Sequence, residues 1–313
     1  MAESFCRVGD IELCYETFGD PAEPALLLIM GLGTQMLGWD EEFCTDLAGR
    51  GFHVVRYDNR DIGRSTILDS YPAPTLGQLL RRDARAAAYT LAEMAADGVG
   101  LLDHLGIERA HLVGASMGGM IAQTIAARRP ERVLSLVSIM SSTGSRITGQ
   151  PALRTYRKFL RPGPSDREAY IEQAIDLFHW IGSTGFDPDE AALRDLLGRM
   201  YDRGHHASSA GRQLAAILAS GNRAVELRRI TAPTLVIHGT KDRLVAPSGG
   251  RATARAIPGA RLLMIEGMGH DLPRAAWPQI LDAIVETAER AHHPPLNSAA
   301  PAGVAQSVRA AES

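Results

Sequence analysis

The stretch Gly114-Ala115-Ser116-Met117-Gly118 is the most informative signal of the fold in this 313-residue chain. The apolar residues before it have strand character, and residues 117–127 after it have the spacing of a helix. A serine with a glycine two positions away on each side fits a sharp turn at which the strand and the helix approach closely. Such a turn holds the serine in strained geometry with its hydroxyl presented as a nucleophile. An ordinary glycine-rich turn is the competing interpretation.

Strand and helix patterns alternate along most of the chain on both sides of this turn. Apolar or alternating runs typical of strands cover residues 11–18, 25–30, 53–57, 110–115, 133–139, 234–238 and 261–265. Helical spacing covers residues 41–50, 75–105, 117–127 and 277–289, with Thr75 as the expected N-cap of the second helix. The alternation predicts an α/β fold with a mostly parallel central sheet flanked by helices.

This alternation stops between residues 144 and 229, where the sequence is helix-like, broken by turns and rich in aromatic residues. We therefore expect a core made of residues 1–143 and 230–291, with a helical cap inserted at residues 144–229. The last residues, 292–313, contain mainly alanine, proline and serine with few large apolar side chains. That composition predicts a disordered tail.

Two residues downstream of the serine could activate it. A serine hydroxyl is a weak nucleophile until a histidine takes its proton, and an acid must orient that histidine. Asp242 follows the predicted strand at 234–238, and His270 follows the predicted strand at 261–265. All three residues thus come after strand ends, the edge at which open α/β sheets place their sites. The sequence predicts a catalytic triad of Ser116, Asp242 and His270, with a turn aspartate and a surface histidine as the alternatives.

Two backbone N–H groups beside the serine would have to stabilise the oxyanion of such a reaction. The expected donors are Met117, directly after the serine, and Leu32, in the glycine-containing loop after the strand at 25–30. A dinucleotide-binding loop is a poor alternative, because Met36 replaces the third glycine of that pattern. Candidates for the substrate pocket, with core packing as the alternative, are Gly31, Met36, Phe178, Trp180 and Phe186.

The segment Asp58-Asn59-Arg60-Asp61-Ile62-Gly63-Arg64-Ser65 is also rich in charge. We interpret it as a structural loop in which Arg60, Asp61 and Arg64 pair with one another. Contact with a substrate is the minority interpretation.

Composition excludes several classes of function. The net charge of −3 without a basic cluster gives no indication of nucleic-acid binding, and the early apolar run at 25–33 is too short to cross a membrane. Cys6, Cys14 and Cys44 are predicted to be buried or half-buried thiols, because an odd, sparse set is not a disulfide framework. No spacing typical of a metal site occurs, and no cofactor is expected. The N-terminus lacks a secretory pattern, so the expected compartment is the cytoplasm, although a mature sequence with its signal removed would look the same.

Over residues 8–290 the chain resembles the α/β-hydrolase superfamily. The resemblance rests on Met30-Gly31-Leu32-Gly33, the segment at 56–65, the serine turn, His238-Gly239-Thr240-Lys241-Asp242 and Gly267-Met268-Gly269-His270. Within the superfamily it is similar to actinobacterial esterases of the aclacinomycin methylesterase-like type. The resemblance implies hydrolysis of carboxylic esters without a cofactor, with a cap that shapes the pocket. One departure from the family pattern is Met30, where many relatives have histidine. The oxyanion donor in this loop is a backbone N–H group, so the different side chain at position 30 does not remove it.

The leading hypothesis is a serine esterase that acts on small to medium uncharged esters through an acyl-enzyme. A lactonase, amidase or peptidase on the same triad is the nearest alternative. A non-catalytic ligand-binding protein of this fold is a remote one, since a degraded triad would favour it and this triad is intact. The expected partner is a small-molecule ester, and a homodimer is left open.

Overall fold

A computed structural model of the chain describes residues 3–152, 154–155, 158, 164 and 166–292. Apart from its first residue, the tail expected at 292–313 lies outside the described residues. Cys6, Cys14 and Cys44 are free and buried, as predicted.

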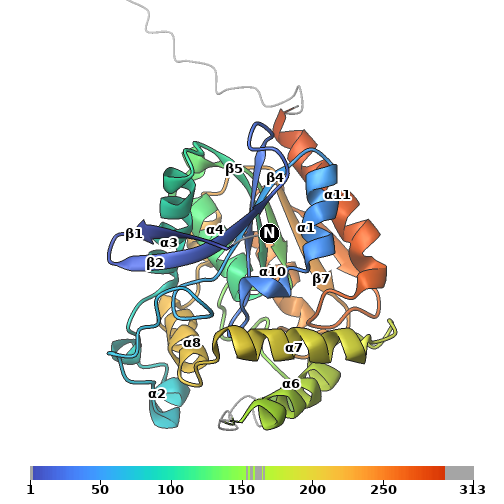
Figure 1. The fold of residues 1–313 in the computed structure, drawn as a ribbon. Helices are drawn as coiled ribbons and strands as arrows, with labels where there is room; N and C mark the ends of the chain where they lie inside the picture. Colours follow the sequence, from blue (N-terminus) through green and yellow to red (C-terminus); the bar gives the residue numbers. More distant parts are fainter. Residues whose placement is uncertain (1–2, 153, 156–157, 159–163, 165, 293–313) are drawn as a thin grey trace, which may run out of the picture.

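One sheet of eight strands forms the centre of the molecule, in the order β1-β2-β4-β3-β5-β6-β7-β8 (Figure 1). The strands are β1 (Ser4–Val8), β2 (Ile11–Phe18), β3 (Ala25–Ile29), β4 (His53–Tyr57), β5 (Ala110–Ala115), β6 (Val133–Ile139), β7 (Thr234–Gly239) and β8 (Arg261–Ile265). β1 pairs with β2, and β2 with β4, in antiparallel fashion; from β4 to β8 all neighbours are parallel. The mostly parallel sheet predicted from the sequence is confirmed, and β1 is an addition to it.

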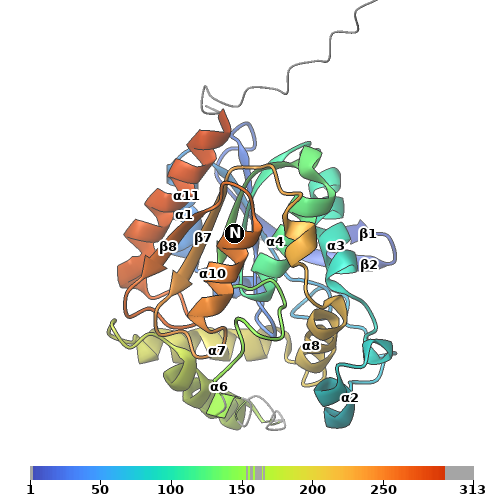
Figure 2. The ribbon, with the colours of Figure 1, turned by 180° about the vertical axis from the view of Figure 1, so that it is seen from behind.

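Helices cover both faces of this sheet (Figures 1 and 2). One face carries α1 (Glu41–Gly49) and α11 (Trp277–His292), and the other carries α3 (Leu91–His104), α4 (Met117–Arg128) and α10 (Pro247–Ala256). In β3, Leu26 and Leu28 pack in the cluster under α1 and α11, whereas Leu27 packs under α3 and α4. The split follows from strand geometry, because successive side chains point to opposite faces. Short 3-10 turns lie at Met36–Gly38, Ala84–Ala86, Pro130–Arg132 and Arg274–Ala276.

The single helix predicted at 75–105 is wrong in its middle. Thr75 does cap α2 (Leu76–Arg81), forming a capping box with Gln78. The helix stops at Arg82, whose φ of 52° is left-handed, and Thr90 starts α3 with a second capping box. Apolar spacing continues across both helices, but α2 has already ended at Arg82. The Thr90 side chain begins a separate helix by accepting the backbone N–H of Ala92.

Within the described part of residues 144–229, the chain between β6 and β7 forms α6 (Arg167–Ile181), α7 (Glu190–Gly204), α8 (Ser209–Ser220) and α9 (Ala224–Leu227). Helices α6, α7 and α8 lie across one end of the sheet (Figures 1 and 2). Ile171, Ile175 and Leu197 form a small apolar cluster between α6 and α7. These helices therefore stand over the sheet edge that carries the serine turn. We use the word cap for the described part of residues 144–229.

The charged side chains of the loop after β4, residues 58–65, do not form ion pairs with one another. Arg60 binds Asp97 of α3, Asp61 binds Arg212 of α8, and the third side chain, Arg64, binds Glu3. The prediction of mutual pairing is therefore wrong. The loop passes between several elements, and each charged side chain reaches the opposite charge that packs against it.

Arg212 is the side chain on which we expect stability to depend strongly. Its Nη2 lies 2.6 Å from Asp61 Oδ1, and the two side chains are 2% and 0% exposed. Replacing Arg212 with methionine leaves a buried carboxylate without its cation, so we expect the free energy of unfolding to fall by about 3–5 kcal/mol. Chemical denaturation measures this change.

Arg199→Met is the matched control, because its ion pair with Asp195 is 56% and 68% exposed. That variant should lose less than about 1 kcal/mol. Equal losses in the two variants would show that burial of the Arg212 pair contributes nothing to stability.

Candidate active site

Ser116 occupies the turn between β5 and α4 with a φ of 56°, a conformation that non-glycine residues rarely adopt. Its N–H donates to the carbonyl of Ile139 in β6 at 2.8 Å, which fixes the turn to the neighbouring strand. A Cβ at Gly118 would clash with the carbonyl of Ile29, so glycine is required where α4 passes β3. The strand and helix expected around the serine are both present.

The three side chains predicted to form a triad lie in one hydrogen-bonded row. His270 Nε2 is 3.0 Å from Ser116 Oγ, although the two residues are 154 positions apart in the sequence. The other ring nitrogen, His270 Nδ1, is 2.8 Å from Asp242 Oδ2. Parallel strands bring these residues together, because Ser116 follows β5, Asp242 follows β7 and His270 follows β8 at the same sheet edge.

The carboxylate of Asp242 is buried and held from several sides. Its Oδ1 accepts the N–H groups of Leu244 and Val245 at 2.9 and 2.8 Å. Burial alone would raise the pKa of Asp242, but the imidazoles of His270 and His238 lower it to about 2. Sequence reasoning assigned no role to His238, whose Nε2 lies 3.4 Å from Asp242 Oδ2. Its position four residues before the aspartate, at the end of β7, was the available signal.

The cap holds the loop that carries His270. The N–H of His270 donates to the carbonyl of Ile181 at 2.8 Å, and the N–H of Gly269 donates to Ser183 Oγ at 2.9 Å. Ser183 Oγ in turn donates to Asp271 Oδ1 at 2.6 Å. Burial raises the pKa of the Asp271 carboxyl. Sequence reasoning missed Ser183 and Asp271, because nothing local in the sequence relates the cap to the histidine loop.

The loop after β3 runs directly beside the serine. A Cβ added to Gly31 would lie 3.0 Å from Ser116 Cβ. Met117 is the first residue of α4, and an N–H at that position has no partner within its own helix. Among the hydrogen bonds of the described residues, none uses the N–H of Leu32. Since the hydrogen bonds of the described residues also include none from the Met117 N–H, both predicted oxyanion donors can bind an oxygen atom.

A cavity of about 1410 Å³ lies between the cap and the sheet edge, and Ser116 and His270 are part of its wall. Of the predicted pocket residues, Gly31, Phe178 and Phe186 line it, together with Leu32 and Met117.

The structure places Met36 and Trp180, the other two predicted pocket residues, away from the cavity wall. Met36 is fully buried, and its N–H donates to Asp58 Oδ1. The indole of Trp180 donates to Thr155 Oγ1 at 3.0 Å and stacks on Arg243. Because residues two apart on a helix point in different directions, Trp180 cannot face the same way as Phe178 on α6.

Comparisons with known proteins agree with this architecture. Residues 24–167 match the family model described as alpha/beta hydrolase fold, and residues 201–274 match the one described as serine aminopeptidase, S33. The chain is 31% identical over 300 residues to rhodomycin D methylesterase of Streptomyces peucetius, covering 88% of this chain and 94% of the relative. It is 25% identical over 282 residues to 3-oxoadipate enol-lactonase 2 of Acinetobacter baylyi, covering 88% and 92%. A solved hydrolase from Pseudomonas aeruginosa PA01 is 27% identical with a TM-score of 0.68, covering 92% and 98%.

A parallel sheet with a strained serine turn at its carboxyl edge, and helices inserted above that turn, defines a hydrolase of the α/β class. The chain belongs to the α/β-hydrolase family, which confirms the resemblance found in the sequence. Among the helices of the described residues, none combines the length and apolar character needed to cross a membrane.

Proposed function

We propose that the protein is a cofactor-independent serine esterase. Ser116 Oγ attacks the ester carbonyl carbon while His270 Nε2 takes its proton, and the N–H groups of Leu32 and Met117 stabilise the oxyanion. His270 then returns the proton to the departing alcohol, and a water molecule activated by the same imidazole hydrolyses the acyl-enzyme. The observation that carries this proposal is the hydrogen-bonded row from Ser116 through His270 to Asp242 on the cavity wall.

The cavity supports substrates larger than the small and medium esters expected from the sequence. Its volume of about 1410 Å³ exceeds the roughly 300–1,000 Å³ of common small-molecule sites. Similarity to a methylesterase favours a methyl ester, whose leaving alcohol is small, attached to a bulky uncharged acid. Similarity to an enol-lactonase makes lactone hydrolysis on the same triad the second candidate.

The test combines covalent labelling with a substrate panel. A fluorophosphonate probe should add one equivalent of mass, and peptide mapping should place the adduct on Ser116. Hydrolysis of methyl esters should exceed that of matched lactones and anilides. A protein that binds the panel compounds but neither turns them over nor reacts with the probe would be a ligand-binding member of the fold.

Two aromatic residues of the cap are expected to select the acyl chain. Phe178 and Phe186 line the cavity, so truncating either to alanine removes apolar contact with a long chain. Each methylene that loses its contact costs about 0.8 kcal/mol, or about fourfold in rate. We expect the ratio of kcat/KM for hexanoate over acetate esters to fall by at least that factor.

Trp180→Ala is the matched aromatic control, because its indole binds Thr155 instead of lining the cavity. This variant should change both substrates by the same factor. If folded Phe178→Ala and Phe186→Ala also changed both substrates equally, the cap aromatics would not be the selector, and the loop around Leu32 would be examined next.

A further inference from the structure

Gln213 on α8 reaches from the cap to the loop beside the serine. Its buried side chain accepts the N–H of Gly33 on Oε1 at 2.9 Å and donates from Nε2 to the carbonyl of Arg60 at 3.0 Å. Both partners are backbone groups of fixed polarity, so only one orientation of the amide satisfies them. A single cap side chain thus fixes the residue that follows Leu32.

Gln35 connects the same loop to α7. Its Nε2 donates to the carbonyls of Met200 and Gly204 at 2.7 and 3.0 Å, at the C-terminal end of that helix. Carbonyls at a helix end lack partners within the helix, so the glutamine supplies a hydrogen bond that the helix cannot make itself. Its Oε1 accepts from Arg203 Nη1 at 2.9 Å, which sets the orientation of this amide as well.

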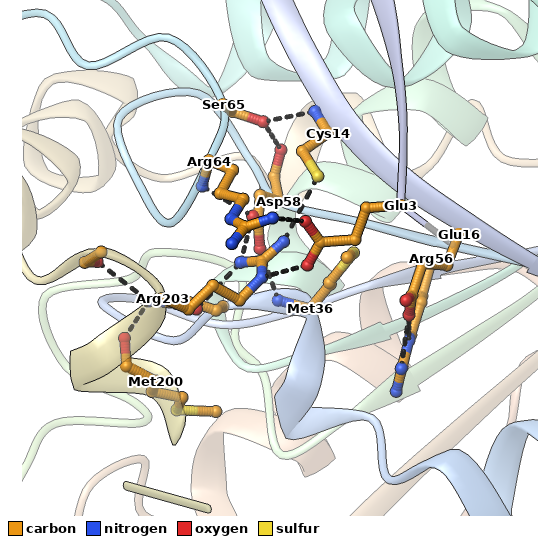
Figure 3. Close-up of polar contacts among 12 residues, drawn as sticks. Glu3, Cys14, Glu16, Met36, Arg56, Asp58, Arg64, Ser65, Met200 and Arg203 are labelled. Carbon is orange, nitrogen blue, oxygen red and sulfur yellow. Dashed lines mark hydrogen bonds and ion pairs between the residues drawn. The ribbon is translucent and has the colours of Figure 1, made fainter. Parts of the chain in front are cut away.

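Arg203 closes the network through a buried carboxylate (Figure 3). Its Nη1 lies 2.5 Å from Asp58 Oδ2, and Asp58 Oδ1 accepts the N–H of Met36 at 2.8 Å. A Cβ at Gly63 would clash with both the Asp58 carboxylate and the Arg203 guanidinium, so the ion pair leaves no room for a side chain at position 63. Arg203 also binds Glu3, as Figure 3 shows. The arginine comes from α7, and so this contact again runs from the cap to the loop.

Three positions of the loop, 33, 35 and 36, are therefore fixed by hydrogen bonds that depend on α7 and α8. Leu32 lies between Gly31, which passes beside Ser116, and Gly33, which is held by Gln213. An oxyanion donor acts only when it lies about 2.7–3.1 Å from the developing charge. A misplacement of about 1 Å can cost on the order of 10²-fold in rate.

We propose that helices α7 and α8 of the cap set the position of the Leu32 N–H, with Gln213, Gln35 and Arg203 as positioning residues for the oxyanion hole. The proposal rests on the esterase function proposed above. It makes the cap part of the machinery that determines kcat, in addition to its role in enclosing the substrate.

Neutral, near-isosteric variants test this without leaving a buried charge. Gln213→Met and Gln35→Met remove the hydrogen bonds while keeping side-chain volume. The matched control is Gln123→Met: this buried glutamine of α4 also makes two side-chain hydrogen bonds, to Ser138 and Arg223, away from the loop.

We expect each loop variant to lower kcat by about tenfold and the double variant by about a hundredfold, with KM changed less than about twofold. Affinity for a trifluoromethyl ketone, which forms an oxyanion on Ser116, should fall by the same factors as kcat. Hydrogen exchange of the amides at 31–38 should become faster in both variants. Gln123→Met should change none of these quantities by more than about twofold, although its melting temperature is expected to fall.

Each result decides a separate point. Unchanged exchange at 31–38 would overturn the proposed tether. Faster exchange with kcat equal to that of Gln123→Met would show that the tether exists but does not position the donor, which overturns the proposal. If the wild-type protein hydrolysed no ester or lactone, the esterase function would fail, while the exchange measurement would still decide whether the cap holds the loop.

Discussion

Replacing Ser116 with alanine is expected to lower kcat for ester hydrolysis by about 10⁴- to 10⁶-fold, because it removes the hydroxyl that is hydrogen-bonded to His270 Nε2 and would form the acyl-enzyme. The methyl side chain fits the space of the hydroxymethyl group, and the hydroxyl makes only the hydrogen bond to His270 among the described residues. The fold should therefore be retained, with a melting temperature near that of the wild type. Initial rates on a methyl ester, together with circular dichroism, measure both quantities.

Ser248→Ala on α10 is the appropriate control, since that hydroxyl accepts the N–H of Gly149 and takes no part in the row of catalytic groups. It should retain activity within a few-fold of the wild type. If a folded Ser116→Ala protein that no longer reacts with the fluorophosphonate probe hydrolysed the ester at a near wild-type rate, Ser116 would not be the nucleophile.

The second largest effect is expected for Asp242→Asn, with a loss of about 10³- to 10⁴-fold in kcat. The asparagine NH₂ group would face His270 Nδ1 and favour the tautomer that carries its proton on Nε2. That nitrogen could then no longer accept the proton of Ser116. Asp271→Asn is the matched control, because Asp271 directly follows His270 in the sequence and lines the cavity, but its carboxylate accepts a hydrogen bond from Ser183. Its loss should stay below about tenfold.

The pH dependence of kcat/KM is a second measurement of the role of Asp242. A pKa of about 2 keeps Asp242 ionised throughout an assay range of about pH 4–9, so its titration cannot produce the acidic limb of kcat/KM. The stabilisation that comes with this lowered pKa is present above the unfolded value near 3.9 and is lost only as the pH falls toward 2. The acidic limb of kcat/KM should therefore be the same whether or not the Asp242 carboxylate is counted among the titrating groups. If kcat fell more in Asp271→Asn than in Asp242→Asn, Asp271 and not Asp242 would be the acid that orients His270.

Several parts of the fold and the site depend on short-range rules and could be predicted from the sequence. The serine turn requires a buried strand, small residues and a helix within a dozen positions, and all of these are adjacent in the chain. Thr75 could be identified as an N-cap for the same reason. The long-range grouping of Ser116, Asp242 and His270 was also predictable, because parallel strands share one carboxyl edge.

Side-chain partners across elements could not be predicted in this way. Asp61 pairs with Arg212 instead of its neighbours, and Phe178 lines the cavity whereas Trp180 of the same helix binds Thr155. These choices depend on how α6 and α8 rotate against the core, and no local pattern specifies that rotation.

From the sequence alone, most of the core strands and helices, the serine turn and the family could be determined, because each depends on residues close together in the chain or on the shared edge of parallel strands. Strand β1, helix α10 and the break between α2 and α3 could not. Only the tertiary structure decided which cap groups hold the catalytic loops. Gln213 and Gly33 are 180 positions apart, and their hydrogen bond exists because α8 packs beside the loop after β3. Such a contact requires two surfaces to be brought together in space, and neither segment carries a local signal of the other.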